Sequence, residues 1–472
     1  MNDSSADKGA QTAQPMFASR RKLYLRTAQG IFQNWRIALV VLTQVIFYGL
    51  PWLNWGDRQA FLLELVTRKF YLFGVVFWPQ DIIYLTALLI LSAYSLFLFT
   101  AVAGRLFCGF ACPQTIYTQM LIWIENAIEG GRNARMKRDA APWSANKIVR
   151  KLSKHGLWLL LAWWTGVTFV GYFTPIRELV TELPFGVSGW ALFWILLYGG
   201  MVYALAGLLR EQVCKYMCPY ARFQSVMIDR DTMVVTYDTA RGEPRGARGR
   251  KADLKAMQLG HCIDCELCVQ VCPTGIDIRN GLQYECIGCA ACIDACDDVM
   301  KKMDYPLGLV RYTTDNALAF GYGKKEIWKR VFRPRTLIYT AILLAITVAV
   351  AVSLWTRNPL KVDVLRDRAM MVREATPGVL ENVYRLQIMN TEERVHQFVI
   401  EVAGLPGIEV GELEQPIRID GASARMVPLS VRFKLPRDGF EAGMHPIMFT
   451  VRTEDGKTLR RDEKSTFMVP KN

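Results

Sequence analysis

The sequence predicts an α-helical membrane protein of five spans that carries an inserted cysteine-rich domain and ends in an all-β domain. Three observations support this fold class. Hydrophobic residues make up 51% of the chain, Trp occurs 13 times and the mean hydropathy is +0.14, values typical of a membrane protein. All 12 Cys lie between residues 108 and 296. The last part of the chain changes to short stretches of alternating polar and apolar residues.

Apolar runs of membrane-crossing length predict the spans. Residues 1–36 form an N-terminal segment that ends in basic residues, and residues 61–79 are apolar but interrupted by charges, which predicts an interfacial or loop-packing segment. The predicted membrane domain covers residues 37–209, and a fifth span is predicted separately. The predicted spans are residues 37–53, 82–103, 156–173, 189–209 and 337–355.

Basic residues in the loops predict the orientation of these spans. Lys and Arg concentrate in the loop 104–155 and just before the fifth span, and they are sparse in 174–188. The positive-inside rule therefore predicts that the N-terminus and residues 210–336 are cytoplasmic. We expect the spans to lie in the inner membrane of a bacterium. The same rule accounts for the net charge of +14, so we expect no nucleic-acid partner.

Residues 356–472 predict a periplasmic all-β domain. The stretches VYRLQIMN, HQFVIEVAGL, ARMVPLSVRFK and HPIMFTVRTEDG alternate as strands do, and Gly- and Pro-containing turn signals separate them. The size and the number of strands predict an immunoglobulin-like sandwich, although the Cys and Trp hallmark of antibody domains is absent from this segment.

Two matched cysteine runs predict an iron–sulfur domain within residues 210–336. Residues 262–273 read CIDCELCVQVCP and residues 286–296 read CIGCAACIDAC, so each run has the spacing C-x₂-C-x₂-C-x₃-C. This is the bacterial ferredoxin pattern for two [4Fe-4S] clusters, in which the fourth Cys of each run ligates the other cluster. The predicted ligands are Cys262, Cys265, Cys268 and Cys296 for one cluster, and Cys286, Cys289, Cys292 and Cys272 for the other.

Zinc is the alternative occupant, but zinc sites close at four ligands and use more widely separated pairs. The second run departs from the ferredoxin pattern because Asp297, and not Pro, follows its last Cys. This departure removes no ligand.

Two further cysteine pairs follow the second and fourth predicted spans. FCGFACPQ contains Cys108 and Cys112, and VCKYMCPY contains Cys214 and Cys218, so both are C-x₃-C-P. Their equivalent positions predict that the four thiols lie at one depth on the cytoplasmic side. They could bind a copper ion, since thiolates select Cu(I), cycle between dithiol and disulfide, or hold a further cluster. Ordinary buried cysteines are the alternative to all three.

Taken together, these motifs resemble the cytochrome c oxidase accessory proteins called CcoG, FixG or RdxA, which are membrane-bound polyferredoxins. The resemblance extends from about residue 20 to the end of the chain and rests on the ordered combination of spans, cluster motifs, C-x₃-C-P pairs and β domain. It implies a cupric reductase that converts Cu(II) to Cu(I) for the assembly of cbb-type oxidase. It also implies Cys108, Cys112, Cys214 and Cys218 as the copper or thiol-redox site.

The partners implied by the resemblance are a copper transporter or chaperone and the assembly factors of the oxidase. The sequence identifies no electron donor and leaves a homo-oligomer open. Two other functions are compatible with the motifs: a general respiratory, quinol-linked ferredoxin-type subunit, and an assembly scaffold without turnover.

Overall fold

The computed structural model describes residues 22–183, 186–254, 256–366, 372–436, 440–455 and 459–470. The chain forms two compact units. The first comprises Met1–Thr43, Leu96–Trp163 and Gly199–Leu337, and the second comprises Gln44–Ser95, Trp164–Tyr198 and Ile338–Asn472.

Four helical stretches in the described part of the chain are long and apolar enough to cross a membrane. Large apolar side chains such as Leu89 (63% exposed) and Leu344 (62% exposed) lie on their surfaces, as lipid contact requires. Together with the relatives reported below, these helices identify a membrane protein. The four stretches are Ile31–Trp52, Pro79–Ala103, Gly189–Leu209 and Pro334–Trp355.

The predicted span 156–173 falls mostly within α6 (Ala145–Val170), which begins with several basic residues and is not one of these four. The count of five spans therefore stays a prediction. Helix α1 (Ile31–Gly49) begins six residues before the predicted start, because its first turns are amphipathic and bury Arg36. Residues 61–79 contain a small antiparallel sheet, with strands β3 (Phe61–Glu64), β4 (Lys69–Leu72) and β5 (Val75–Phe77).

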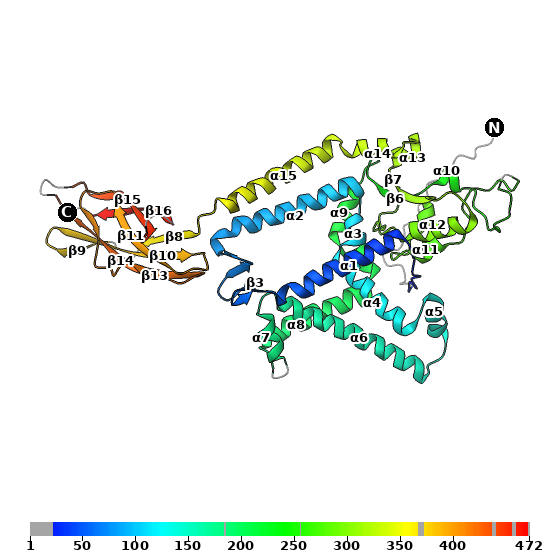
Figure 1. Ribbon diagram of the computed structural model, residues 1–472, viewed down its shortest axis with the longest axis horizontal. Coiled ribbons are helices and arrows are strands. Elements are labelled where there is room, and N and C mark those ends of the chain that lie inside the picture. The colour runs from blue at the N-terminus through cyan, green and yellow to red at the C-terminus, as the bar shows by residue number, and fades with distance from the viewer. Residues whose placement is uncertain are drawn as a thin grey trace, which may run out of the picture. The chain divides into compact units, whose positions relative to one another are not determined.

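The first unit contains the two cysteine runs. Strands β6 (Val234–Tyr237) and β7 (Val310–Thr313) pair antiparallel, and helices α11 (Leu267–Gln270) and α12 (Ala291–Met303) lie beside them (Figure 1). Their buried residues form one apolar core that includes Val235, Met300 and Leu309. Shorter helices complete this region: α10 (Thr239–Gly242), α13 (Asp315–Phe320) and α14 (Lys324–Val331).

Helical segments also carry the C-x₃-C-P pairs in the first unit. Cys108 lies in α3 (Leu106–Phe110) and Cys214 in the π-helical turn Val213–Met217. Cys112 and Cys218 are extended residues that cap the next helices, whose first residues are Pro113 and Pro219. Proline fits this first helical position because its missing N–H has no partner there in any case. The two capped helices are α4 (Pro113–Glu129) and α9 (Pro219–Met227), and α5 (Arg132–Ala140) follows α4.

The second unit ends in a β-rich domain of two antiparallel sheets (Figure 1). One sheet has the order β12-β14-β10-β8, with β9 on β10, and the other has the order β13-β11-β15-β16. Tyr384, Phe398, Phe433, Phe449 and Phe467, drawn from both sheets, are fully buried in one core. The strands are β8 (Leu360–Arg366), β9 (Arg373–Thr376), β10 (Val379–Asn390), β11 (His396–Ala403), β12 (Ile408–Val410), β13 (Ile417–Ile419), β14 (Ser423–Lys434), β15 (Gly443–Thr453) and β16 (Arg460–Val469).

The four stretches predicted as strands fall in β10, β11, β14 and β15. Residues 367–371 and 437–439, which belong to the predicted β domain, lie outside the described residues, as does most of the predicted N-terminal segment.

Candidate iron–sulfur and thiol site

The two cysteine runs adopt the same local backbone shape. In the first, Asp264 and Glu266 have φ angles of 54° and 55°. In the second, Gly288 and Ala290, at the same offsets from the first Cys, have φ angles of 64° and 58°. Left-handed residues at alternate positions turn the chain tightly, so each run curls its first three cysteines around a common centre.

These loops line two small cavities in the first unit. One cavity is lined by Cys262, Cys265, Cys268 and Cys296, which we call the outer cage because the Cys265 side chain is exposed. The other is lined by Cys272, Cys286, Cys289 and Cys292, which we call the inner cage. Cys268 also contributes to the wall of the inner cage.

The structure thus places the fourth cysteine of each run with the loop of the other run. Burial raises the pKa of Cys268, Cys286 and Cys296 to about 12. Ionising buried thiols is costly unless a metal takes the charge, and four cysteines per cavity are the donor set of a [4Fe-4S] cluster. The residues present therefore fit the two clusters, and the assignment of individual ligands stays a prediction.

The four C-x₃-C-P cysteines, which we call the thiol quartet, gather in one place. Burial raises the pKa of Cys108 to about 12, and charge at Cys112, Cys214 and Cys218 raises it further. Burial likewise raises the pKa of Cys214 to about 11, with contributions from Cys112 and Cys218. The Cys108 thiol donates a hydrogen bond to Gln224 Oε1 at 3.2 Å, and Gln224 is fully buried.

The thiol quartet packs directly on the loop of the inner cage. Cys108 and Cys214 contact the apolar cluster formed by Val271, Ile287, Cys289, Ala291 and Ala295. Gly109 makes this approach possible, because a Cβ there would lie 2.8 Å from the Cα of Cys289. Among the described residues, no three or more His, Cys, Asp or Glu side chains are close enough to hold a single metal ion.

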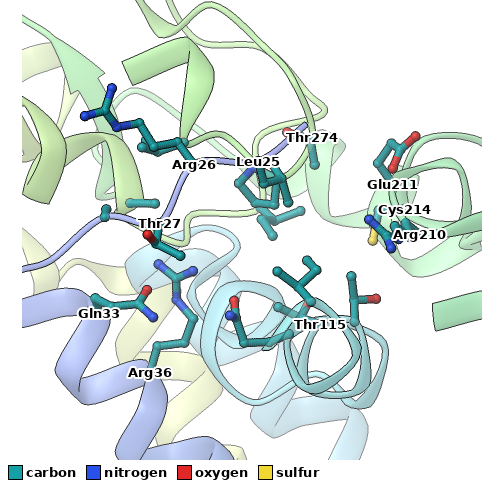
Figure 2. Close-up of a pocket in the computed structure, with 18 of the residues that line it drawn as sticks. Leu25, Arg26, Thr27, Gln33, Arg36, Thr115, Arg210, Glu211, Cys214 and Thr274 are labelled. Carbon is teal, nitrogen blue, oxygen red and sulfur yellow. The ribbon is translucent and has the colours of Figure 1, made fainter. Parts of the chain in front are cut away.

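A pocket gives one of these thiols access to solvent (Figure 2). Cys214 lines it beside Arg210 and Glu211, and Arg36 extends from α1 into the opposite wall. Further polar side chains come largely from α4, from α1 and from the chain before α1: Thr27, Gln33, Gln114, Thr115, Thr118, Gln119 and Asn126.

A buried ionic network supports the segment that carries Cys214. Glu125 on α4 accepts from Arg210 at 2.8 Å and from Arg135 at 3.0 Å, and lies 3.7 Å from Lys154. Glu129 pairs with Lys154 at 3.1 Å. Burial by itself raises the pKa of Glu125, but the three cations outweigh it, and the pKa lies below its ordinary value.

Three site features were missed by reasoning from the sequence: the contact at Gly109, and the two buried arginines Arg36 and Arg105. Arg36 donates to the backbone oxygen of Cys289 at 2.8 Å, and Arg105 donates to the backbone oxygen of Ala221. A sequence signal existed for Arg36, since a charged residue at the edge of an apolar helix is costly and is often functional.

Three known families match this chain. The family described as a 4Fe-4S dicluster domain matches residues 209–315, and another described as a 4Fe-4S binding domain matches residues 85–129. A third, described as an IG-like fold at the C-terminal of FixG, matches residues 350–470.

Known proteins are similar over nearly the whole chain. The nitrogen fixation protein FixG of Rhizobium meliloti is 34% identical, with 99% of this chain and 96% of that protein covered. Protein RdxB of Cereibacter sphaeroides is 37% identical over 87% of each chain. Protein RdxA of the same organism is 34% identical, with 89% of this chain and 88% of that protein covered.

Proposed function

Because this chain belongs to the family of FixG, RdxA and RdxB and is an iron–sulfur electron-transfer protein, we propose that it reduces Cu(II) to Cu(I) for the assembly of cbb-type cytochrome c oxidase. One observation carries the proposal: Cys108 and Cys214 of the thiol quartet pack against the loop of the inner cage, and Cys214 lines a pocket that opens to solvent. An acceptor bound there lies next to a source of single electrons.

The chemistry of the thiol quartet favours copper as this acceptor. Bound clusters supply one electron at a time, and each Cu(II) needs one electron to become Cu(I). Cysteine sulfur is a soft ligand that prefers Cu(I) to Cu(II), so binding at the quartet favours the reduced ion. In this proposal cysteines of the quartet bind copper as substrate, and the pocket beside Cys214 admits it.

The proposed topology places this chemistry on the cytoplasmic side. The N-terminus and the cysteine-rich domain would lie in the cytoplasm and the β-rich domain in the periplasm, as the basic loops favour. Cu(I) would then pass to a copper transporter or chaperone, and the β-rich domain would face the oxidase assembly factors. Reporter fusions at the chain ends test this orientation, and a periplasmic N-terminus would contradict it.

The decisive experiment uses purified, anaerobic protein in detergent, reduced with dithionite and then freed of excess reductant. Cu(II) is added, Cu(I) is followed with a specific chelator, and cluster oxidation is followed by EPR. We expect one Cu(I) for each electron lost. The double variant Cys108→Ser, Cys214→Ser should keep its cluster signals and lose copper reduction, whereas Met217→Leu, at an exposed position between Cys214 and Cys218, should keep both. Full copper reduction by the double variant would refute the site.

A second function, a respiratory electron relay, is favoured by one observation. Residues 85–129, which include Cys108 and Cys112, match a family described as 4Fe-4S binding, so the thiol quartet could hold a further cluster. Iron analysis separates the two: two clusters give about eight iron atoms per chain, and three give about twelve. A pure scaffold would show clusters but no reaction with Cu(II).

A further inference from the structure

The charges around the two cages differ. The outer cage is lined by Arg279, but this guanidinium forms ion pairs with Asp277 at 2.7 Å and with Asp264 at 2.5 Å. Asp297, next to Cys296, adds another negative charge near the same cage. The Arg279 cation beside the outer cage is therefore neutralised. A second guanidinium, that of Arg248, donates to the backbone oxygen of Cys262 at 3.1 Å, but its side chain is only half-buried, so solvent screens its charge more than that of a fully buried group.

Among the described residues, two buried arginines without a carboxylate partner lie beside the inner cage. Arg36 is 5% exposed, and one of its terminal nitrogens donates to the backbone oxygen of Cys289 at 2.8 Å. Its Nε is buried and makes no hydrogen bond to any described residue. The guanidinium charge of Arg36 therefore lies directly against the loop of the inner cage.

Arg105 approaches the inner cage from the side of the thiol quartet. It is also 5% exposed, and its backbone carbonyl carbon would lie 3.2 Å from a Cβ on Gly288. Arg105 lines a pocket together with Cys286 and Gly288 of the inner-cage loop. Within the part of the chain that the structure describes, neither Arg36 nor Arg105 forms an ion pair with a carboxylate.

The nearest acidic side chain on α12 is already engaged. Asp294 accepts from the backbone N–H groups of Phe32 and Gln33, at 3.2 Å and 2.7 Å, and so caps the start of α1. The positive end of that helix offsets the carboxylate. Other carboxylates line the pockets beside these arginines, and they include Asp229, which is paired with Arg333 at 2.5 Å, and Glu211, which lies across the pocket from Arg36. Neither of these two carboxylates forms an ion pair with Arg36 or Arg105 in the described part of the chain, so both guanidinium charges act on the inner cage.

Reduction adds a negative charge to an iron–sulfur cluster, so nearby positive charge raises its reduction potential, while burial lowers it. The inner cage is the more buried, and these two effects oppose each other there. Charge interactions are stronger where the surroundings are less polar. The buried guanidinium groups of Arg36 and Arg105 therefore outweigh the paired Arg279 and the half-buried Arg248 of the outer cage.

From this difference we infer that Arg36 and Arg105 hold the reduction potential of the inner cluster above that of the outer cluster. A single electron on the pair of clusters then resides mainly on the inner cluster, beside the thiol quartet. An external reductant donates this electron at the exposed side of the outer cage, at Cys265. Arg36 and Arg105 are positioning residues: they set where the electron resides and bind no substrate. The inference rests on the proposed clusters and is independent of copper.

The test is an EPR-monitored redox titration of the full-length, cluster-loaded protein in detergent, without copper. The wild type should show two transitions. In Cys265→Ser, the lower transition should shift or disappear, because that ligand belongs to the outer cage. If the upper transition responds instead, the outer cluster has the higher potential and the inference is overturned. This comparison stands even if the arginine variants fail to load iron.

The arginine variants then test the cause. Arg36→Gln and Arg105→Gln should each lower the upper transition and leave the lower one in place, and Arg36→Lys should restore most of the shift because it keeps the charge. Arg26→Gln is the matched control, since this exposed arginine precedes the same helix. An unchanged upper transition in both glutamine variants, or equal shifts of both transitions, would overturn the inference. Copper reduction by any variant does not enter this test, so a failed copper assay leaves it intact.

Discussion

Replacing Glu125 by glutamine would remove the central negative charge from a buried ionic network. The Glu125 side chain is 2% exposed, Arg135 is 2% exposed, and Lys154 and Arg210 are 6% and 12% exposed. Solvent therefore screens these charges weakly. Removing one partner of a buried ion pair typically costs about 3–5 kcal/mol, because the remaining charge stays buried.

The loss of stability caused by Glu125→Gln should lie within this range and not above it, because the three cations keep other contacts. Lys154 keeps Glu129 at 3.1 Å, and Arg210 keeps the backbone oxygen of Gly207 at 2.9 Å. Arg135 keeps its hydrogen bond to the backbone oxygen of Leu25, at 2.6 Å, but loses its only charge partner among the described residues. For a unit of this size, a loss of about 3–5 kcal/mol lowers the unfolding midpoint by about 6–20 °C.

The assay is thermal unfolding in detergent, followed by Trp fluorescence, with Asp298→Asn as the matched control. Asp298 makes the same change from carboxylate to amide, but it pairs with Lys302 at 2.5 Å on an exposed helix surface. Such pairs contribute less than about 1 kcal/mol, so the control midpoint should move by no more than a few degrees. Equal midpoints for Glu125→Gln and Asp298→Asn would refute the reasoning.

The same network predicts a dependence on pH. The pKa of Glu125 is lowered in the folded protein, so its contribution to stability is present above the unfolded pKa of about 4.3 and is lost as pH falls through the folded pKa. The difference in midpoint between the wild type and Glu125→Gln should therefore be constant near neutral pH and shrink only under acidic conditions. A difference that grows as pH falls would contradict this sign.

Three further predictions concern the cage contact, the thiols and the β-rich domain. Gly109→Ala should lower iron content or shift the EPR signal of the inner cluster, because the new Cβ would lie 2.8 Å from the Cα of Cys289, whereas Gly131→Ala, which has open space around it, should change neither. Burial raises the pKa of Cys214 to about 11, so this thiol should react slowly with iodoacetamide at pH 7.5 in copper-free protein. The rate of alkylation should rise about tenfold per pH unit until the pH approaches the pKa of about 11. A rate that levels off below pH 9 would contradict the assigned burial. Phe449→Ala should destabilise the β-rich domain by about 3–5 kcal/mol, since this ring is fully buried, yet leave the iron content unchanged because the cages lie in the other unit.

The local features of this molecule were predictable from spacing alone. The two cysteine runs each encode their loop within a few residues, and the left-handed pairs Asp264 and Glu266, and Gly288 and Ala290, show why equal spacing gives equal shape. The extended backbone of Cys112 and Cys218 likewise follows from the proline after each, because the residue before a proline disfavours the helical conformation. In each case the interaction that fixes the structure joins neighbours in the chain.

Features that depend on distant partners were not predictable. The first helix begins at Ile31 and not at residue 37, because its polar first turns pack on α12 through Asp294, a partner that no periodicity identifies. The strands β3 to β5 lie in a segment that was predicted to be interfacial or loop-packing, and no strand was predicted there because each is too short for its alternation to be recognised. The role of Gly109 becomes visible only when the loop of Cys289 is in place.

The cages and the thiol quartet should respond differently to substitutions. Each cage is built mainly from one continuous loop, so it depends on local sequence. The thiol quartet joins two segments far apart in the chain, and the buried pair between Arg210 and Glu125 helps to fix one segment against the other. Substitutions in that network should therefore alter the reactivity of Cys214 towards alkylating reagents while the iron content stays at its wild-type value. Loss of both together would show instead that the quartet and the cages fold as one cooperative element.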